Sequence, residues 1–366
     1  MNFLNSSFQI AGPEDSPGIL NLLEDNPFEG RISLIYTRRP DSWESFMREG
    51  DEVMLVVDRN QAQERLDGMA ACAINNLYLK GKPAKIAYLF GLRLRKEAIS
   101  RIMLLPRGYR HFLNRLLDKG VRYAYTTVLE ENTSARRMLE KRRPSMPVYD
   151  YAGDYDVFTL TPGGRGRLPT GYRFRQAGQE DETILLEFLN REGSRYLFFP
   201  FLKAEGLHSG KTTPLLEDFY ILEDRNREIL AAGAIWDQRD YKQYILKGYR
   251  GLYRWIYPIH PLIRLFGYDL CRPGTILSFF TLSCFAAKGG EPEYFHYLLK
   301  GIRSVGCGFV YFVVGLHRRH PFQEVVRRRP NILYRSRLYL VYEEGKMARE
   351  EIIGPNDIPY LECGRL

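Results

Sequence analysis

The residue types that most often bind metals or form covalent intermediates are scattered along this chain. Two of the six histidines, His317 and His320, have the spacing His-x-x-His, but no cysteine or acidic partner accompanies them. The cysteines are odd in number and form no Cys-x-x-Cys pair, so neither a zinc site nor a disulfide framework is expected. This cysteine usage favours a reducing, cytoplasmic location. The five cysteines are Cys72, Cys271, Cys284, Cys307 and Cys363.

A basic, aromatic segment at residues 237–273 carries the strongest binding signal. Between Arg239 and Arg272 it has seven Lys or Arg and two Asp, a net +5 of the chain's +9, with Tyr, Trp and Phe interleaved. Such a segment can lie on an anionic membrane, contact nucleic acid such as an aminoacyl-tRNA, or cover a bulky acyl substrate. The competing interpretation is an extra hairpin arm plus helix that covers the sheet or joins two domains.

Length and composition describe a folded chain of more than one domain. The 366 residues exceed what one compact core usually holds, and 45% hydrophobic with 27% charged residues excludes a disordered or low-complexity protein. The first residues, MNFLNSSFQIAGPEDS, lack the pattern of a secretory signal peptide, and no run of 18 apolar residues occurs. We therefore expect a protein that is neither exported by a signal peptide nor membrane-spanning.

An internal repeat indicates where the domains lie. FQIAGPED at residues 8–15 matches FRQAGQED at 174–181, an offset of 166. Farther on the offset is 186, because Tyr125 matches Tyr311, so the second half contains an insertion. The linker signal between the halves is TPGGRGRLPTG. We predict an N-terminal domain at 1–162, a linker at 163–170, a C-terminal domain at 171–346 that contains the insertion 237–273, and a tail at 347–366.

Each half is predicted to combine a meander of strands with flanking helices. In the first half, strands at 52–58, 67–79 and 85–94 precede a helix that stops at Gly120, and a strand at 122–129 follows. Asn132 then caps a short helix. The expected fold class is α/β (α+β), with two domains that each form a mixed, mostly antiparallel twisted sheet flanked by helices.

This order of elements resembles the GNAT superfamily of acyl-CoA-dependent N-acyltransferases. Tyr123–Lys141, YAYTTVLEENTSARRMLEK, is similar to the family's segment in which a strand is followed by E-N-x-x-A-x-x-x-x-E-K. Ala87–Leu94, AYLFGLRL, is similar to the strand before the family's cofactor loop. Through the repeat, the resemblance implies two GNAT-like domains in tandem.

The resemblance also implies acetyl-CoA, or another acyl-CoA, as the cofactor. The family holds the pyrophosphate on backbone N–H groups of a loop that reads roughly R/Q-x-x-G-x-G/A, at a helix N-terminus. Here the loop is KEAISRIMLLPRGYRHF, residues 96–112, in which other residues stand where glycines are expected. The expected cofactor-binding residues are Leu92, Arg93, Leu94, Ser100, Arg101, Ile102, Arg107, Gly108, Tyr109, Arg110 and Asn132.

Two departures from the family pattern concern the chemistry. Many members have a tyrosine that protonates the departing thiolate, and Leu139 stands at that position here. In the second half, the loop AAKGGEP at 286–292 has two glycines, but Glu291 and Glu293 in the following turn would repel a phosphate. Glu29 and Glu130 are weak candidates for the general base that an ammonium acceptor needs.

The resemblance implies an acyl-CoA-dependent N-acyltransferase, with an acetyltransferase as the first expectation, in which an amine of a small molecule or peptide attacks the thioester directly. A strand N–H near Leu92–Leu94 would polarise the carbonyl. The alternatives are a catalytically inactive GNAT-like binding or regulatory protein, and a transferase that uses the basic insertion to hold an aminoacyl-tRNA or a lipid. The acceptor, the acyl length and the oligomeric state are left open by the sequence.

Overall fold

The computed structural model of the chain describes residues 8–28, 32–60, 62–95, 115–142, 147–164, 167–251, 254–255, 257, 271–343 and 349–366. The elements of the first half are β1 (Phe8–Ile10), α1 (Ser16–Glu24), β2 (Ile32–Thr37), α2 (Ser42–Phe46), β3 (Glu52–Asn60), β4 (Arg65–Leu79), β5 (Lys82–Leu94), β6 (Tyr123–Leu129), α4 (Thr133–Glu140) and β7 (Val148–Leu160).

The second half follows a similar order, without a counterpart of β2 and with β11 and α11 added. Its elements are β8 (Arg173–Gln176), α5 (Glu182–Gly193), α6 (Ala204–Ser209), β9 (Phe219–Glu223), β10 (Ile229–Trp236), β11 (Gln243–Tyr249), β12 (Phe279–Ala287), α9 (Pro292–Val305), β13 (Tyr311–His317), α10 (Gln323–Arg327), β14 (Asn331–Tyr342) and α11 (Arg349–Ile352). Within the described ranges, no helix is long and apolar enough to cross a membrane.

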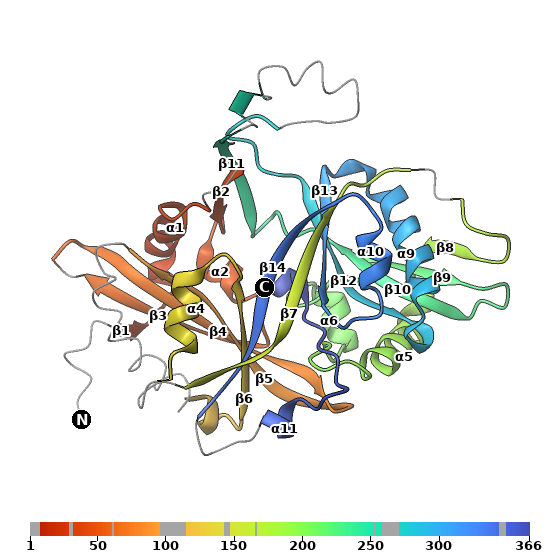
Figure 1. The fold of residues 1–366 in the computed structure, drawn as a ribbon, viewed down its shortest axis with the longest axis horizontal. Helices are drawn as coiled ribbons and strands as arrows, with labels where there is room; N and C mark the ends of the chain where they lie inside the picture. Colours follow the sequence, from red (N-terminus) through yellow and green to blue (C-terminus); the bar gives the residue numbers. More distant parts are fainter. Residues whose placement is uncertain are drawn as a thin grey trace.

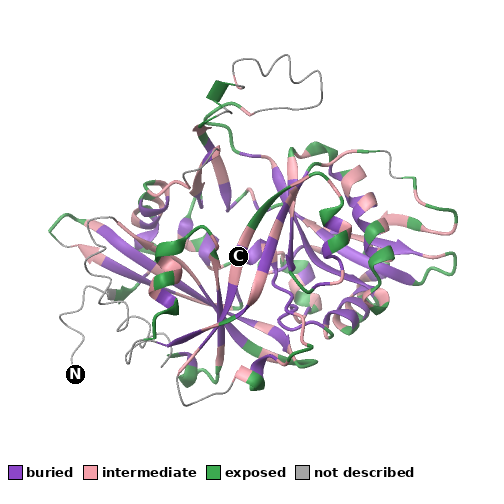
Figure 2. Ribbon diagram, viewed as in Figure 1, coloured by how far each residue is buried: buried purple, intermediate pink, exposed green. Residues whose placement is uncertain are grey.

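One continuous sheet runs through both halves. Its twelve strands in the described residues have the order β1-β3-β4-β5-β6-β14-β7-β13-β12-β10-β9-β8, with the first half at the left and the second at the right of Figure 1. All neighbours are antiparallel except two pairs, β5–β6 and β12–β13. Helices flank the sheet, and Figure 2 shows buried residues concentrated along its central strands. The predicted mixed, mostly antiparallel sheets flanked by helices are thus confirmed.

The two halves exchange their last strands. β14, from the second half, lies between β6 and β7 of the first, and β7 pairs on its other side with β13. The β14–β7 pairing extends from Asn331 opposite Leu160 to Tyr342 opposite Val148. Because each half completes its sheet with the other's strand, the halves share a hydrophobic core, which includes Tyr125 and Leu340. The domain boundaries predicted from the repeat stay a prediction.

The repeated sequence FQIAGPED/FRQAGQED builds the same local device twice. In the first copy the Gly12 N–H donates to Asp15 at 2.9 Å, and in the second the Gly178 N–H donates to Asp181 at 2.8 Å. Each buried aspartate also forms a bidentate pair with an arginine, Arg59 in the first half and Arg175 in the second. The aspartate therefore fixes the turn between the edge strand and the first helix in both halves.

The segment from 237 to 273, which has no counterpart in the first half, joins the two halves at its base. β11 pairs antiparallel with β2 of the first half, with Tyr244 opposite Tyr36, and forms a separate two-stranded sheet at the top of Figure 1. The Gln243 side chain bonds both the N–H and the carbonyl of Arg39. The interpretation of this segment as an arm joining the domains therefore holds for its described base.

A buried ion cluster lies beneath this arm. Arg38 and Glu49, each 2% exposed, form an ion pair, and Lys242 Nζ lies 3.4 Å from the same Glu49 oxygen. Lys242 also donates to the carbonyls of Gly364 at 3.0 Å and Leu366 at 3.3 Å. The Glu49 carboxylate thus links Arg38, which follows β2, to Lys242, which precedes β11. Lys242 extends this link to the C-terminal residues.

Removing that carboxylate should be costly. Glu49→Ala leaves the guanidinium of Arg38 and the ammonium of Lys242 buried without their counter-charge, and we expect a loss of about 3–5 kcal/mol in the free energy of unfolding. Urea denaturation followed by circular dichroism measures the loss. Glu44→Ala, at an exposed position of helix α2, which precedes Glu49, is the control and should cost at most about 0.5 kcal/mol. Equal stability of the two variants would contradict the role given to Glu49.

Candidate functional site

The two parallel strand pairs are where the sheet opens. β5 and β6 pair from Ile86 with Tyr123 to Tyr88 with Tyr125, and beyond that point no register pairs join them. Just past the last pair, the Thr126 hydroxyl donates to the Leu89 carbonyl at 2.7 Å. The unpaired strand ends that follow, residues 89–94 of β5 and 126–129 of β6, run toward the same edge of the sheet. They are called the first splay below.

Aromatic rings stack beside the first splay. Tyr88 stacks on Phe90 with centroids 5.1 Å apart and on Tyr125 at 4.9 Å, and Tyr125 stacks on Phe198 at 5.1 Å. Burial raises the pKa of both tyrosines, so their phenols are neutral at neutral pH. The Tyr88 hydroxyl lies 3.2 Å from the Thr127 hydroxyl. The rings form an apolar wall with a polar edge.

A β-bulge in β5 lies three residues beyond the last strand pair. Opposite the single residue Ala70 of β4, β5 has two residues, Gly91 and Leu92, and Gly91 has φ +64°. A bulge with a left-handed first residue turns backbone groups out of the ladder, which is why glycine suits this position. The backbone N–H that is predicted to polarise the thioester carbonyl, near Leu92–Leu94, comes directly after this glycine.

The second half repeats the bulge with its backbone groups in use. Cys284, φ +47°, and Phe285 in β12 face the single residue Gly233, three residues beyond the last β12–β13 pair. The Cys284 N–H donates to the Glu362 carboxylate at 2.9 Å, and the Phe285 N–H donates to the Tyr360 hydroxyl at 3.2 Å. The C-terminal residues therefore fill this second splay and satisfy its donors.

The glycine loop of the second half is also taken by a carboxylate of the chain. The Gly289 N–H donates to Glu192 Oε2 at 3.0 Å, and Glu192, 5% exposed, pairs with Arg191 and Arg195. Backbone donors at the second splay thus bind the carboxylates of Glu362 and Glu192. The donors that a phosphorylated cofactor would use there already have acceptors. This adds a structural reason to the repulsion expected from Glu291 and Glu293.

Arg93 brings positive charge to the first splay. Its guanidinium lies 5.0 Å from the centroid of the Phe28 ring, and its Nε is buried with no hydrogen-bond partner among the described residues. Burial lowers its pKa, and the nearby phenols of Tyr36 and Tyr244 counteract part of that effect. Leu92 and Leu94, its neighbours on β5, pack partly buried against the core of the first half.

Asn132 lies at the same edge, after β6. Its side chain accepts a hydrogen bond from the Ala135 N–H at 3.1 Å, so it caps α4 as expected. Its side chain is exposed, which leaves it accessible to a ligand. The other expected cofactor residues, Ser100, Arg101, Ile102, Arg107, Gly108, Tyr109 and Arg110, lie outside the described residues.

The structure describes one of the two candidate bases and the position at which the family has its acidic tyrosine. Glu130 follows β6 and forms an ion pair with Arg335 at 3.3 Å. Glu29 lies outside the described residues. Leu139, at the position of the family's tyrosine, is 7% exposed and packs in the core of the first half. Among the described residues, no group of three His, Cys, Asp or Glu is arranged to hold a metal ion.

Sequence reasoning missed the buried ion cluster near the splay. The charge of Glu49 contributes to the raised pKa of both Tyr88 and Tyr125, so the cluster acts electrostatically on the aromatic wall. Nothing in the spacing of Arg38, Glu49 and Lys242 marks them as partners. They meet because β2 and β11, about two hundred residues apart in the chain, pair with each other.

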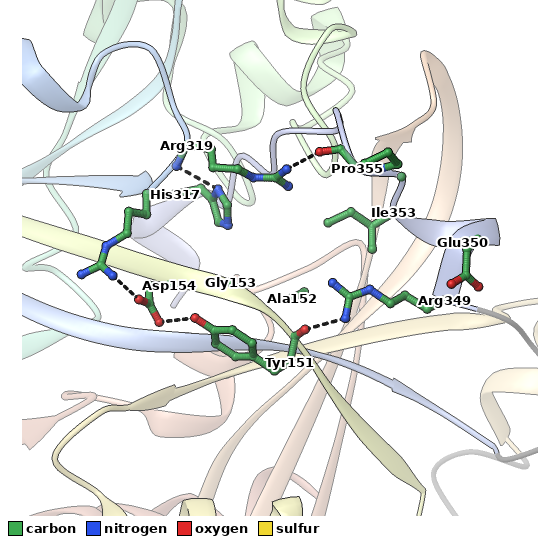
Figure 3. A pocket seen from close by; sticks show the side chains of 12 residues that line it. Tyr151, Ala152, Gly153, Asp154, His317, Arg319, Arg349, Glu350, Ile353 and Pro355 are labelled. Atoms are coloured by element: carbon green, nitrogen blue, oxygen red, sulfur yellow. Dashed lines mark hydrogen bonds and ion pairs between the residues drawn. The ribbon is translucent and has the colours of Figure 1, made fainter.

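A separate cavity of about 550 Å³ lies between β7, the end of β13 and the segment that contains α11. Figure 3 shows His317, Arg349 and Tyr151 around it, with the Arg349 guanidinium bonded to the Tyr151 carbonyl at 2.9 Å. Arg318 and Arg319 are also engaged, with Asp154 and with the carbonyls of Pro355 and Asp357. Since its arginines already have partners, this cavity is a weaker anion site than the first splay.

The buried histidines next to this cavity should make stability depend on pH. Burial lowers the pKa of His317 to about 4 and that of His320 to about 3. The unfolded chain therefore binds these protons first as pH falls below about 6.5, so stability is present above that pH and is lost below it. His320→Phe, which keeps the ring against Tyr196, should reduce the slope between pH 6 and 4 by roughly 1.4 kcal/mol per pH unit. Urea titrations at several pH values test this, and an unchanged slope would contradict it.

The carboxylate in the second splay should be structural. Glu362→Ala removes the acceptor of the buried Cys284 N–H and of the Gly364 N–H, and we expect a loss of about 2–4 kcal/mol in the free energy of unfolding. Glu351→Ala, on α11 and exposed, is the control variant for urea denaturation. If the Glu362 carboxylate alone keeps acyl-CoA out of the second splay, Glu362→Ala should bind a second equivalent of acyl-CoA, which calorimetry would detect.

Comparisons with known proteins identify the fold. No protein-family model matches the chain, and no curated protein matches it in sequence. Among solved structures, Saccharomyces cerevisiae N-myristoyltransferase with bound myristoyl-CoA is similar, with a TM-score of 0.59 and 13% identity over 93% of this chain and 84% of that chain. A second structure of the yeast enzyme with bound myristoyl-CoA gives a TM-score of 0.59 and 12% identity over 93% and 80%.

A further match is a probable N-acyltransferase from Enterococcus faecalis V583, with a TM-score of 0.46 and 11% identity over 91% of this chain and 71% of that chain. The fold shared with the yeast enzyme agrees with the resemblance that the sequence carried. At these identities the similarity concerns the fold. The chain thus shares the fold of the yeast enzyme, with two GNAT-like halves joined in one sheet.

Proposed function

We propose that the protein is an acyl-CoA-dependent N-acyltransferase that binds its cofactor at the first splay. The observation that carries the proposal is the repeated bulge. In the second half the bulge N–H of Cys284 binds a carboxylate oxygen of Glu362, and Gly91 occupies the corresponding place in β5. A thioester oxygen at the first splay would play the part that Glu362 plays at the second.

Charge and edge geometry support the same location. Arg93, whose Nε has no described partner, lies on β5 beyond the bulge, and the exposed side chain of Asn132 follows the neighbouring strand. An anionic ligand along this edge would meet a cation and the N-terminus of α4. The pyrophosphate of an acyl-CoA is such a ligand, with the loop at 96–112 as its proposed cradle.

The reaction we propose is direct attack of an amine on the thioester carbonyl. The neutral amine nitrogen forms the new C–N bond, and the C–S bond of the tetrahedral intermediate breaks. CoA leaves as thiolate and takes up the proton that the nitrogen loses, which gives the amide and free CoA thiol. The acceptor must lose a proton before attack, and Glu130 is a base candidate together with Glu29. The apolar wall of Tyr88, Phe90 and Tyr125 suits a site from which water is excluded.

The length of the acyl chain can be measured directly. The family resemblance implies acetyl-CoA first, whereas the yeast enzyme of similar fold was solved with myristoyl-CoA. Titration calorimetry with acetyl-, octanoyl- and myristoyl-CoA ranks the chain lengths. Binding of at least one acyl-CoA with one equivalent per chain is expected, and no binding of any of them would overturn the proposal.

A second candidate function follows from Leu139. Since this buried leucine occupies the place of the tyrosine that protonates the thiolate in many GNAT enzymes, a GNAT-like protein that binds acyl-CoA without transferring the acyl group is the alternative. Thiol release with primary amines and amino-terminal peptides, followed with a disulfide reagent, separates the two. Release above the uncatalysed rate supports the transferase, and tight binding without release supports the alternative.

Asn132 allows capping and cofactor contact to be separated. Asn132→Ser keeps an N-cap of similar strength, so the thermal midpoint should stay close to that of the unmodified chain. If the amide contacts the cofactor, the dissociation constant for acyl-CoA should rise about five- to tenfold, as expected for the loss of one hydrogen bond. Thermal unfolding measures the midpoint, and titration calorimetry measures the dissociation constant. An unchanged affinity would make Asn132 a helix cap alone.

A further inference from the structure

The arm at residues 237–273 is anchored at its base by two of its own cations. Arg239 pairs with Asp237 at 2.6 Å, and Lys242 lies in the buried cluster with Glu49. These charges are therefore neutralised within the fold. The net positive charge that the sequence assigns to the arm must be sought beyond β11.

Beyond β11 the arm is basic and poor in acids. From Arg250 to Arg272 the sequence has four Arg and one Asp. Arg254 and Arg272 are exposed, and neither has an ion-pair partner among the described residues. Cations on such a projecting segment attract anionic surfaces over about a Debye length, roughly 8 Å at physiological salt.

Exposed apolar side chains accompany these cations. Trp255 is 77% exposed and Ile276 is 50% exposed, and the described parts of the arm project from the body of the molecule at the top of Figure 1. Trp255 is the most exposed large hydrophobic residue of the described chain. An indole held in water next to arginines is costly unless a partner covers it.

We propose that the described residues around the end of β11 dock on an anionic lipid surface, with Trp255 of the arm and Ile276, three residues after the arm, in the interface region and Arg254 and Arg272 on the headgroups. Indole rings favour the boundary between headgroups and hydrocarbon, and each nearby cation contributes about 1 kcal/mol on an anionic leaflet. The aliphatic Ile276 favours lipid over nucleic acid, whose binding sites pair cations with stacked aromatic rings. The proposal is independent of the proposed acyl transfer.

The test is sedimentation of the full chain with lipid vesicles. We expect binding to vesicles of phosphatidylcholine mixed with phosphatidylglycerol, weak binding to phosphatidylcholine alone, and loss of binding in high salt. Arg254→Glu combined with Arg272→Glu should reduce the partition coefficient for these vesicles at least tenfold. Trp255→Ala should reduce it by a smaller factor. The control Lys203→Glu with Lys211→Glu makes the same charge change at exposed positions elsewhere and should bind as the unmodified chain does.

Two further measurements distinguish lipid docking from binding of transfer RNA. Trp255→Phe should abolish the blue shift of tryptophan fluorescence on vesicles, because Trp236 is 4% exposed and Trp43 is half-buried. Equal sedimentation of the arm and control variants, or binding of transfer RNA through Arg254 and Arg272 without binding to vesicles, would overturn the proposal. Acyl-CoA affinity should be the same in the arm variants, so failure here leaves the proposed transfer reaction untouched and the reverse also holds.

Discussion

The position of β14 between β6 and β7 constrains the whole molecule. Its backbone bonds the first half along both sides, so neither half can close its sheet with its own residues. The shared core that results, with Tyr125 and Leu340 among its members, holds the two parallel strand pairs at a fixed separation. A duplicated unit has in this way become a single folded body, in which long-range pairing connects the chain's beginning to its end.

Duplication gave both halves the same opening in the sheet and the same bulge, and the two copies differ in what occupies them. In the second half, Glu362 and Glu192 satisfy the backbone donors that would otherwise invite an anion. Buried donors need acceptors, so the chain's own carboxylates close that site. In the first half the corresponding backbone donors belong to the bulge at Gly91, and Arg93 adds a cation. We therefore assign the proposed chemistry to the first half.

The arm connects the fold's asymmetry to the charge of the chain. Its base is a structural element, because β11 pairs with β2 and Lys242 completes the ion cluster around Glu49. Its outer part carries the exposed side chains of Arg254 and Trp255. A segment absent from one half thus serves both to join the halves and, in our proposal, to bring the molecule to an anionic surface.

The sequence alone determined the repeat, the strand meander, the cap at Asn132 and the GNAT-type fold, because these depend on local periodicity, turn chemistry and short motifs. It aligned Tyr125 with Tyr311, whereas the strand register places Val313 at the corresponding point. Strand exchange, the closure of the second splay by Glu362, and the meeting of Arg38, Glu49 and Lys242 came only from the tertiary structure. Each depends on contacts between residues far apart in the chain, and no local pattern encodes which distant carboxylate will satisfy a buried donor or cation.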